Sequence, residues 1–503
     1  MVPATAPATS PAVTVVETKL YSIPSDGTKL TDTVASPDNL HVAVVESKDG
    51  SHKVVVDGTA GPAHEWVVRQ SLGFAAAGGR FAYQVQQGAT MHAATGTAGP
   101  PQGDKAGPAT AATNAATAPA PGVRWDPLGP GFYVVGRMMF SPDGRRFAYA
   151  AQRAKDGPTV VEVDGAEHPP AAEVFTADMQ FSPDGKRFVY RVREAGGGTP
   201  PAASQPGQAP ATGPTSAGRQ RYVLDGVPQP AYDAVGRFTF SPDGSRFGYV
   251  ARSGTQTTMV IDGKETARHA AVAGLTFSAD GKRYAYAVEQ ADAAGKLGGK
   301  QALVANDGAG EKQYQSFDGL GAIAFSPDGR RVAITTQAGK AWTVVLDGKP
   351  AGAYDGTGGL MFSPDSKRLA VVAGRGRQQF VAVDGKEDPP ADLIVSAAFS
   401  PDSARVAAVV VANGQRWLTA DGVRIGPGTT FAFAPTGRRV AHALPAPGGR
   451  TYTIALDGQP ASPEYDASPP GARLVWESPT TVRTIAGRGK DLFLVRLKVG
   501  SRQ

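Results

Sequence analysis

The chain of 503 residues is too long for one ordinary hydrophobic core, so it predicts several domains or a repeat array. Hydrophobic residues make up 41% and charged residues 19%, which is typical of globular proteins. The net charge of +6 forms no basic patch with interleaved aromatics, so nucleic-acid binding is not expected, and the lack of cysteine excludes disulfides, thiolate metal sites and cysteine nucleophiles.

Residues 1–12, MVPATAPATSPA, form an Ala/Thr/Pro segment that we expect to be a flexible lead-in. The segment lacks the basic start and apolar run of a secretion signal. No run of about 18 apolar residues occurs in the chain, so no membrane span is expected.

From residue 13 onward the chain repeats one pattern. An apolar run ends in an anchor residue, and then come a Ser-Pro-Asp-Gly turn, a second run, a loop, a third run closing on Asp-Gly, and a weaker fourth run. The tightest anchor spacings are 34–41 residues, a period typical of solenoids, propellers and arrays. The eleven anchors are Ala35, Phe74, Phe140, Phe181, Phe240, Phe277, Phe325, Phe362, Phe399, Phe433 and Glu477.

The runs are short and rich in Val, Ile, Phe, Tyr and Thr, which predicts strands. Asp-Gly between two strands favours the type I′ hairpin turn. Each repeat is therefore predicted to be a four-stranded antiparallel meander. Such a unit must stack on its neighbours, and radial stacking gives an all-β fold, a β-propeller of about eleven four-stranded blades.

The stretches FSPDGRRFAY, FSPDGKRFVY and VVLDGKPAGAYDGTGGLMFSPDSKRLAVV resemble the WD-repeat-like propellers of the TolB type. The resemblance extends from about Val13 to Val499, and it is weakest in the last repeat, ESPTTVRTIA. It implies a bacterial protein in the periplasm or outside the cell, with a cytoplasmic location as the alternative.

Propellers typically have about four to eight blades, so we expect two tandem rings. Seven and nine residues after the anchor, repeats 2 to 6 carry aromatics such as Phe81 and Tyr83. Repeats 7 to 10 carry Val332, Leu369, Val406 and Val440 at the first position and Ile334, Val371, Ala408 and His442 at the second. This change predicts a border near Gly319. Residues 13–319 are then a first propeller of about six blades, and residues 320–503 a second of about five.

The last repeat supplies only three strands, so a fourth must come from elsewhere. With two rings, Lys312–Phe317 completes the second ring and the N-terminal run TVVETKLYSI completes the first. With one ring, the N-terminal run completes the last repeat directly. The sequence allows both arrangements.

Large Ala/Gly/Pro/Thr insertions fall at residues 88–122 and 194–218, with a smaller one at 289–300. We expect the two larger ones to be disordered, and all three to connect the second and third strands of their blades. They would then share one face of the propeller, as recognition loops or as tolerated linkers.

A cation follows each anchor by six residues and predicts an electropositive ring on the tight-turn face. The ring suggests an anion-binding or acidic-partner surface. The alternative is local pairing with the Asp three residues earlier, as in Asp143 and Asp184. The candidate residues are Arg80, Arg146, Arg187, Arg246, Arg283, Arg331, Arg368, Arg405 and Arg439, followed by Arg483, with His41 in the first repeat.

No catalytic, cofactor or metal site is expected. The seven histidines lack metal-ligand spacing, and no Gly-x-Ser-x-Gly elbow or glycine-rich phosphate loop occurs. We therefore expect a non-catalytic scaffold that binds a protein or peptide. The alternatives are a propeller hydrolase or lyase with residues gathered at the axis, and a structural surface or envelope protein.

Overall fold

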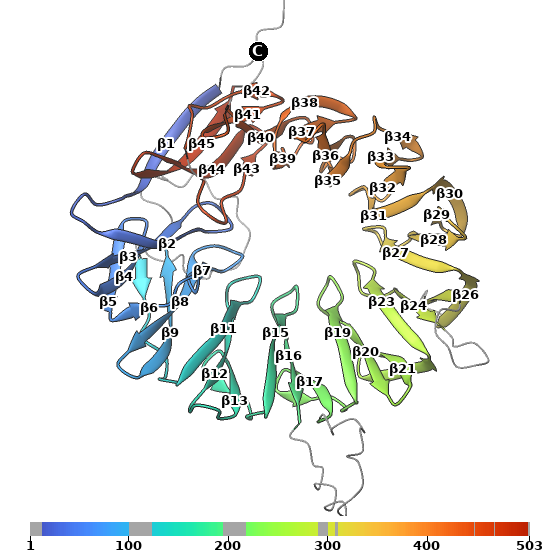
Figure 1. The fold of residues 1–503 in the computed structure, drawn as a ribbon, viewed down its shortest axis with the longest axis horizontal. Helices are drawn as coiled ribbons and strands as arrows, with labels where there is room; N and C mark the ends of the chain where they lie inside the picture. Colours follow the sequence, from blue (N-terminus) through green and yellow to red (C-terminus); the bar gives the residue numbers. More distant parts are fainter. Residues whose placement is uncertain are drawn as a thin grey trace, which may run out of the picture.

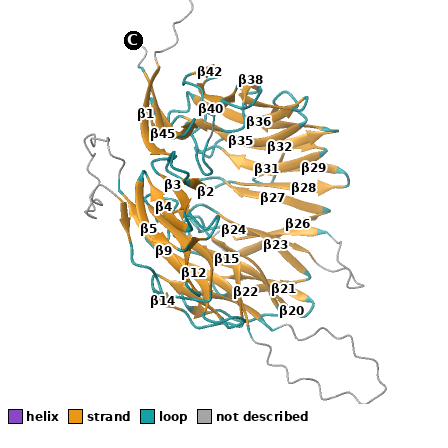
Figure 2. Cartoon of the chain, turned by 60° about the vertical axis from the view of Figure 1, so that its left-hand side comes forward, coloured by secondary structure: helices purple, strands orange, loops and turns teal. Residues whose placement is uncertain are grey.

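The computed structural model describes residues 13–99, 123–194, 218–289, 300–306, 310–446, 448–466 and 468–500. These residues form eleven antiparallel sheets that follow one another around a single ring, in chain order from blue to red (Figure 1). The described chain consists of strands and loops (Figure 2), and it contains no helix long and apolar enough to cross a membrane.

The first six blades follow the predicted repeats. Blade one contains β2 (Lys29–Ala35), β3 (Val42–Lys48), β4 (Ser51–Val56) and β5 (Thr59–His64). Blade two contains β6 (Trp66–Val67), β7 (Gly73–Phe74), β8 (Arg80–Gln87), β9 (Thr90–Ala98) and β10 (Val123–Trp125). Blades three and four contain β11 (Val134–Phe140), β12 (Phe147–Gln152), β13 (Thr159–Val163), β14 (Ala166–Glu167), and β15 (Glu173–Phe181), β16 (Phe188–Arg193), β17 (Gln220–Leu224), β18 (Val227–Pro228). Blades five and six contain β19 (Ala234–Phe240), β20 (Phe247–Ser253), β21 (Gln256–Ile261), β22 (Lys264–His269), and β23 (Ala271–Phe277), β24 (Tyr284–Glu289), β25 (Gln301–Asn306), β26 (Glu311–Phe317).

The remaining blades continue the ring. Blades seven and eight contain β27 (Gly319–Phe325), β28 (Val332–Ala338), β29 (Ala341–Leu346), β30 (Lys349–Tyr354), and β31 (Gly356–Phe362), β32 (Leu369–Arg375), β33 (Gln378–Val383), β34 (Lys386–Glu387). Blades nine and ten contain β35 (Leu393–Phe399), β36 (Val406–Ala412), β37 (Gln415–Ala420), β38 (Val423–Pro427), and β39 (Phe431–Phe433), β40 (Val440–Pro445), β41 (Tyr452–Leu456), β42 (Gln459–Pro460). Blade eleven contains β43 (Val475–Ser478), β44 (Thr481–Arg488), β45 (Asp491–Val499) and the N-terminal strand β1 (Val13–Ser22).

The turns have the predicted chemistry. In the Asp-Gly hairpins both residues have positive φ, for example 54° at Asp164 and 83° at Gly165, as a type I′ turn requires. In the Ser-Pro-Asp-Gly turns the buried serine hydroxyl donates to the aspartate and accepts a backbone amide. In blade seven Ser326 Oγ lies 2.5 Å from Asp328 Oδ1 and 2.9 Å from the Arg331 amide nitrogen.

The expectation of two tandem rings is wrong. Strand β1 pairs antiparallel with β45 from Val13↔Val499 to Ser22↔Asp491 and so completes blade eleven. Blade eleven then packs on blade one, where Ile485 and Leu494 share a core with Val44. Blade eleven thus combines the N-terminal strand β1 with β43, β44 and β45, and this pairing closes the ring. Figure 1 shows β1 beside β45.

The segment Lys312–Phe317 does not complete a separate ring. It lies in β26, which pairs with β25 as the outer strand of blade six. Gly319 is the first residue of β27 and so begins blade seven of the same ring.

The predicted insertions divide between the two faces. Residues 90–98, expected to be part of a disordered loop, form β9, because pairing with both β8 and β10 outweighs the low strand propensity of Ala and Gly. The insertion of blade two therefore links the third and fourth strands, not the second and third, so the prediction that all insertions share one face is wrong. Residues 1–12, 100–122, 195–217 and 290–299 lie outside the described residues.

Candidate functional site

The predicted electropositive ring consists of arginines that fasten one blade to the next. Arg146 Nε donates to Asp164 Oδ2 at 2.7 Å, and an NH group of the same guanidinium donates to the Lys186 carbonyl of the following blade at 2.6 Å. The same pairing with the hairpin Asp is made by Arg187, Arg246, Arg331, Arg368, Arg405 and Arg439. Arg80 and Arg283 donate to carbonyls of the next blade, and Arg483 donates to the Asp38 carbonyl of blade one.

The pairing partner differs from the expected one. Asp143, three residues before Arg146, accepts a hydrogen bond from Ser141 at 2.5 Å instead, and this bond is the first cause that holds its pKa below the usual range. His41 replaces arginine in blade one, with Nδ1 2.6 Å from Asp57 Oδ2. Most donors of the ring are therefore engaged inside the molecule, and an anion-binding role for it stays a prediction.

The histidines are spread over several blades. His64 and His168 lie near the hydroxyls of Tyr83 and Tyr190, at 3.4 Å and 3.3 Å. Burial lowers the pKa of both imidazoles and that of His442, which is fully buried. Among the described residues no three His, Asp or Glu side chains converge as a metal site.

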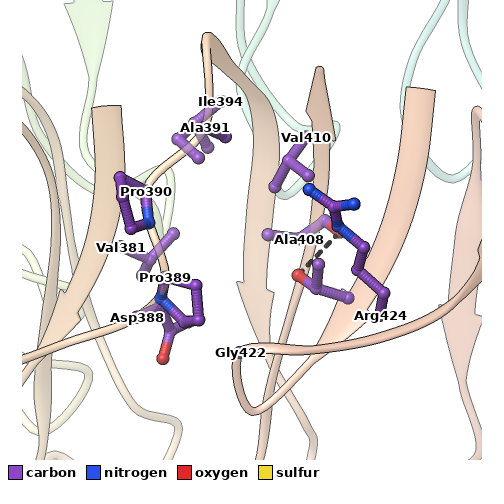
Figure 3. A pocket seen from close by; sticks show the side chains of 11 residues that line it. Val381, Asp388, Pro389, Pro390, Ala391, Ile394, Ala408, Val410, Gly422 and Arg424 are labelled. Atoms are coloured by element: carbon purple, nitrogen blue, oxygen red, sulfur yellow. Dashed lines mark hydrogen bonds between the residues drawn. The ribbon is translucent and has the colours of Figure 1, made fainter. Parts of the chain in front are cut away.

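A small cavity of about 30 Å³ lies between blades eight and nine, with Asp388 and Pro389 on one side and Arg424 on the other (Figure 3). Burial is the main cause of the raised pKa of Asp388. A cavity of this volume holds a water molecule or two and is too small for an organic ligand.

A much larger hollow of about 1010 Å³, here called the 6/7 cleft, opens between blades six and seven. Its walls carry apolar side chains from both blades, with polar residues such as Thr336, Gln337 and Thr343 beside them. Leu303 and Ala305 come from β25 of blade six, and Val332, Ile334 and Val345 come from β28 and β29 of blade seven. Tyr314 of β26 stands at its edge with 48% of its surface exposed.

The 6/7 cleft lies where both walls carry small side chains. Between blades four and five, Leu224 packs against Phe247 and Tyr249. By strand register, Ala305 lies in blade six where Leu224 lies in blade four. Val332 and Ile334 replace the two aromatic residues. Leu303, Ala305 and Ile334 still form one buried cluster across the interface, and the cleft opens beside that cluster.

The blades are nevertheless tied together beside the cleft. An NH group of Arg283 donates to the Gly329 carbonyl at 2.8 Å, and its guanidinium lies 5.1 Å from the Phe325 ring centre. The Leu320 amide donates to Gln301 Oε1 at 2.8 Å. The 6/7 cleft is thus a hollow in a closed ring, held between two fixed walls.

The charges at the 6/7 cleft are unequal. Its two carboxylates are engaged, because Asp347 accepts from Arg331 at 2.9 Å and Asp318 accepts the Gly339 amide at 2.7 Å. Lys300 and Arg330 are exposed, and neither forms an ion pair with a described residue. Asp318 keeps its negative charge, because a backbone amide does not neutralise it, and Arg330 also interacts with the nearby Asp328 carboxylate. With Arg283 included, three lining cations face one carboxylate that has no arginine partner, so the cleft is positive overall.

Sequence analysis did not identify the 6/7 cleft as a site, although the signal was visible. The change from aromatic to aliphatic residues at Val332 and Ile334 was interpreted as a border between rings. In the structure it coincides with the 6/7 cleft, although blades eight and nine carry aliphatic residues at these positions too.

No family model matches the chain, and no curated protein matches it. Similar solved structures include a eukaryotic initiation factor (18% identity, 66% of this chain and 88% of that chain, TM-score 0.39). They also include TolB from Acinetobacter baumannii (15%, 53% and 64%, 0.25) and a Dos1 propeller (8%, 80% and 93%, 0.29). At these identities the likeness concerns the β-propeller fold alone.

Proposed function

We propose that this chain is a non-catalytic propeller scaffold that binds a protein or peptide, and that the 6/7 cleft is its binding site. The supporting observation is the cleft itself, a hollow of about 1010 Å³ with apolar side chains on both walls, larger than the hollow of about 550 Å³ between blades five and six. Ligand sites in proteins have this size and composition. An exposed aromatic such as Tyr314 is a frequent component of protein interfaces.

The chemistry of the 6/7 cleft favours binding over catalysis. General acid–base catalysis needs a titratable group positioned to exchange a proton with the substrate. The two carboxylates of the cleft, Asp318 and Asp347, are held by a backbone amide and by Arg331. Among its described lining residues there is no histidine.

The experiment compares three forms of the intact chain in pull-downs from a lysate of the source cells. The first is the native chain, the second carries Val332→Phe and Ile334→Phe to fill the 6/7 cleft, and the third carries Val423→Ser on the exposed outer strand of blade nine. We expect one partner to bind the first and third forms and to be lost from the second. Equal capture by all three forms would place binding elsewhere and overturn the proposal.

A further inference from the structure

The cations of the 6/7 cleft restrict what it can accept. Arg330 lies in the first turn of blade seven, and Lys300 lies just before β25 of blade six. Arg283 contributes a third cation, and its Nε is buried without a hydrogen-bond partner. Asp347 pairs with Arg331, whereas Asp318 keeps its negative charge while it accepts a backbone amide, so the three cations face one unpaired carboxylate. An acidic partner therefore gains at this site and a basic partner is repelled.

The apolar walls impose a second requirement. Val332, Ile334 and Val345 on one wall face Leu303 and Ala305 on the other. Leu303, Ala305 and Ile334 are already buried, whereas Val332 and Val345 are only partly buried beside the hollow. A large apolar side chain of the partner would cover Val332 and Val345 and remove them from water.

Resting on the proposed function, we propose that the 6/7 cleft recognises an extended acidic peptide segment with one aromatic or large aliphatic side chain. The apolar side chain enters between β25 and β28, and flanking Asp or Glu residues pair with Lys300 and Arg330. Charge and shape thus select the partner together, because each of the two features alone is common on protein surfaces.

The test measures binding of fluorescein-labelled peptides to the intact chain by fluorescence anisotropy. The probe is Gly-Glu-Glu-Phe-Glu-Glu-Gly, with one matched peptide carrying Ala for Phe and another carrying Lys for each Glu. We expect the Ala peptide to bind about tenfold or more weakly, the loss that follows when an aromatic side chain is no longer buried. We expect the Lys peptide not to bind, and added salt to weaken the acidic probe.

Two variants of the chain locate the charges. The double change Lys300→Glu and Arg330→Glu should weaken the acidic probe and allow the Lys peptide to bind. The matched control is Arg145→Glu, the same repeat position in blade three, where the side chain is 82% exposed and remote from the cleft. Arg145→Glu should leave both affinities unchanged.

Several results would overturn this inference. One is equal affinity for the Phe and Ala peptides, and another is an equal effect of Arg145→Glu and the cleft variant. Full displacement of the probe by decanoate, with no dependence on the peptide anchor, would assign the cleft to small amphipathic anions. If the pull-down partner is lost on filling the cleft but no acidic peptide binds, the proposed function survives and only the peptide chemistry is wrong.

Discussion

Filling the 6/7 cleft is predicted to stabilise the protein. The change is Val332→Phe with Ile334→Phe, which restores aromatic rings at the two positions where blades two to six carry them. Both side chains point into a hollow of about 1010 Å³, so the larger rings have space. An ordinary packed interface has no such space, and there the same change is harmful.

The size of the effect follows from the carbon atoms added. The two substitutions add about seven carbons, and each buried carbon contributes about 0.8 kcal/mol. If about half of the added surface is buried and each ring loses about 0.5 kcal/mol of rotamer entropy, the free energy of unfolding rises by about 2 kcal/mol. That is a rise of a few degrees in melting temperature.

The assay is thermal unfolding followed by circular dichroism, beside a matched double variant of blade eight. Leu369 and Val371 occupy the same repeat positions and are as buried as Ile334, but they do not line the 6/7 cleft and have no hollow of that size beside them. Leu369→Phe with Val371→Phe should therefore lower the free energy of unfolding by about 1–3 kcal/mol through overpacking. If the blade-seven variant loses as much stability as the blade-eight variant, the walls of the cleft touch in solution and the reasoning fails.

Three further predictions concern the ring. Replacing Arg331 by Met removes its ion pair with Asp347, which is partly exposed, and should lower the free energy of unfolding measured in urea by about 1 kcal/mol. No loss of stability would show that the arginines do not fasten the blades. Burial lowers the folded-state pKa of His442, so below about pH 6.5 the unfolded state binds more protons and stability falls as the pH drops. His442→Val should therefore reduce the difference between the urea midpoints at about pH 7.5 and about pH 5.5. An unchanged difference would contradict this. Thr18 of β1 and Leu494 of β45 are register partners, so cysteines at these two positions should form a disulfide in the folded chain, which has no other cysteine. Failure to form this disulfide under mild oxidation would contradict ring closure.

The blade architecture was predictable because it is local chemistry repeated. Ser-Pro-Asp-Gly and Asp-Gly define two turns by their backbone preferences, and the apolar runs between them define strands. The number of rings was not predictable in this way. The pairing of β1 with β45 joins residues from opposite ends of the chain, and the sequence was equally compatible with the alternative closure.

The candidate site shows the same limit. The cation six residues after the anchor was recognisable, but its partner is the hairpin Asp, which lies 18 residues further on in the pair Arg146 and Asp164. The 6/7 cleft depends on which side chains of blade six face which side chains of blade seven. A single sequence does not give this pairing. The sequence shows that aromatic residues are missing at positions 332 and 334. Which residues of blade six face these positions follows only from the strand register of the two blades.

Photo-crosslinking tests the central claim, that the 6/7 cleft binds a protein or peptide, most directly. Benzoylphenylalanine is placed at Thr343, which lines the cleft, or at Val423, an exposed position on blade nine, and the products are mapped by mass spectrometry. We predict that peptides of one partner protein are joined to position 343, that they vanish when Val332→Phe and Ile334→Phe fill the cleft, and that position 423 does not yield them. The same products from both positions, or products at 343 that persist when the cleft is filled, would contradict the claim.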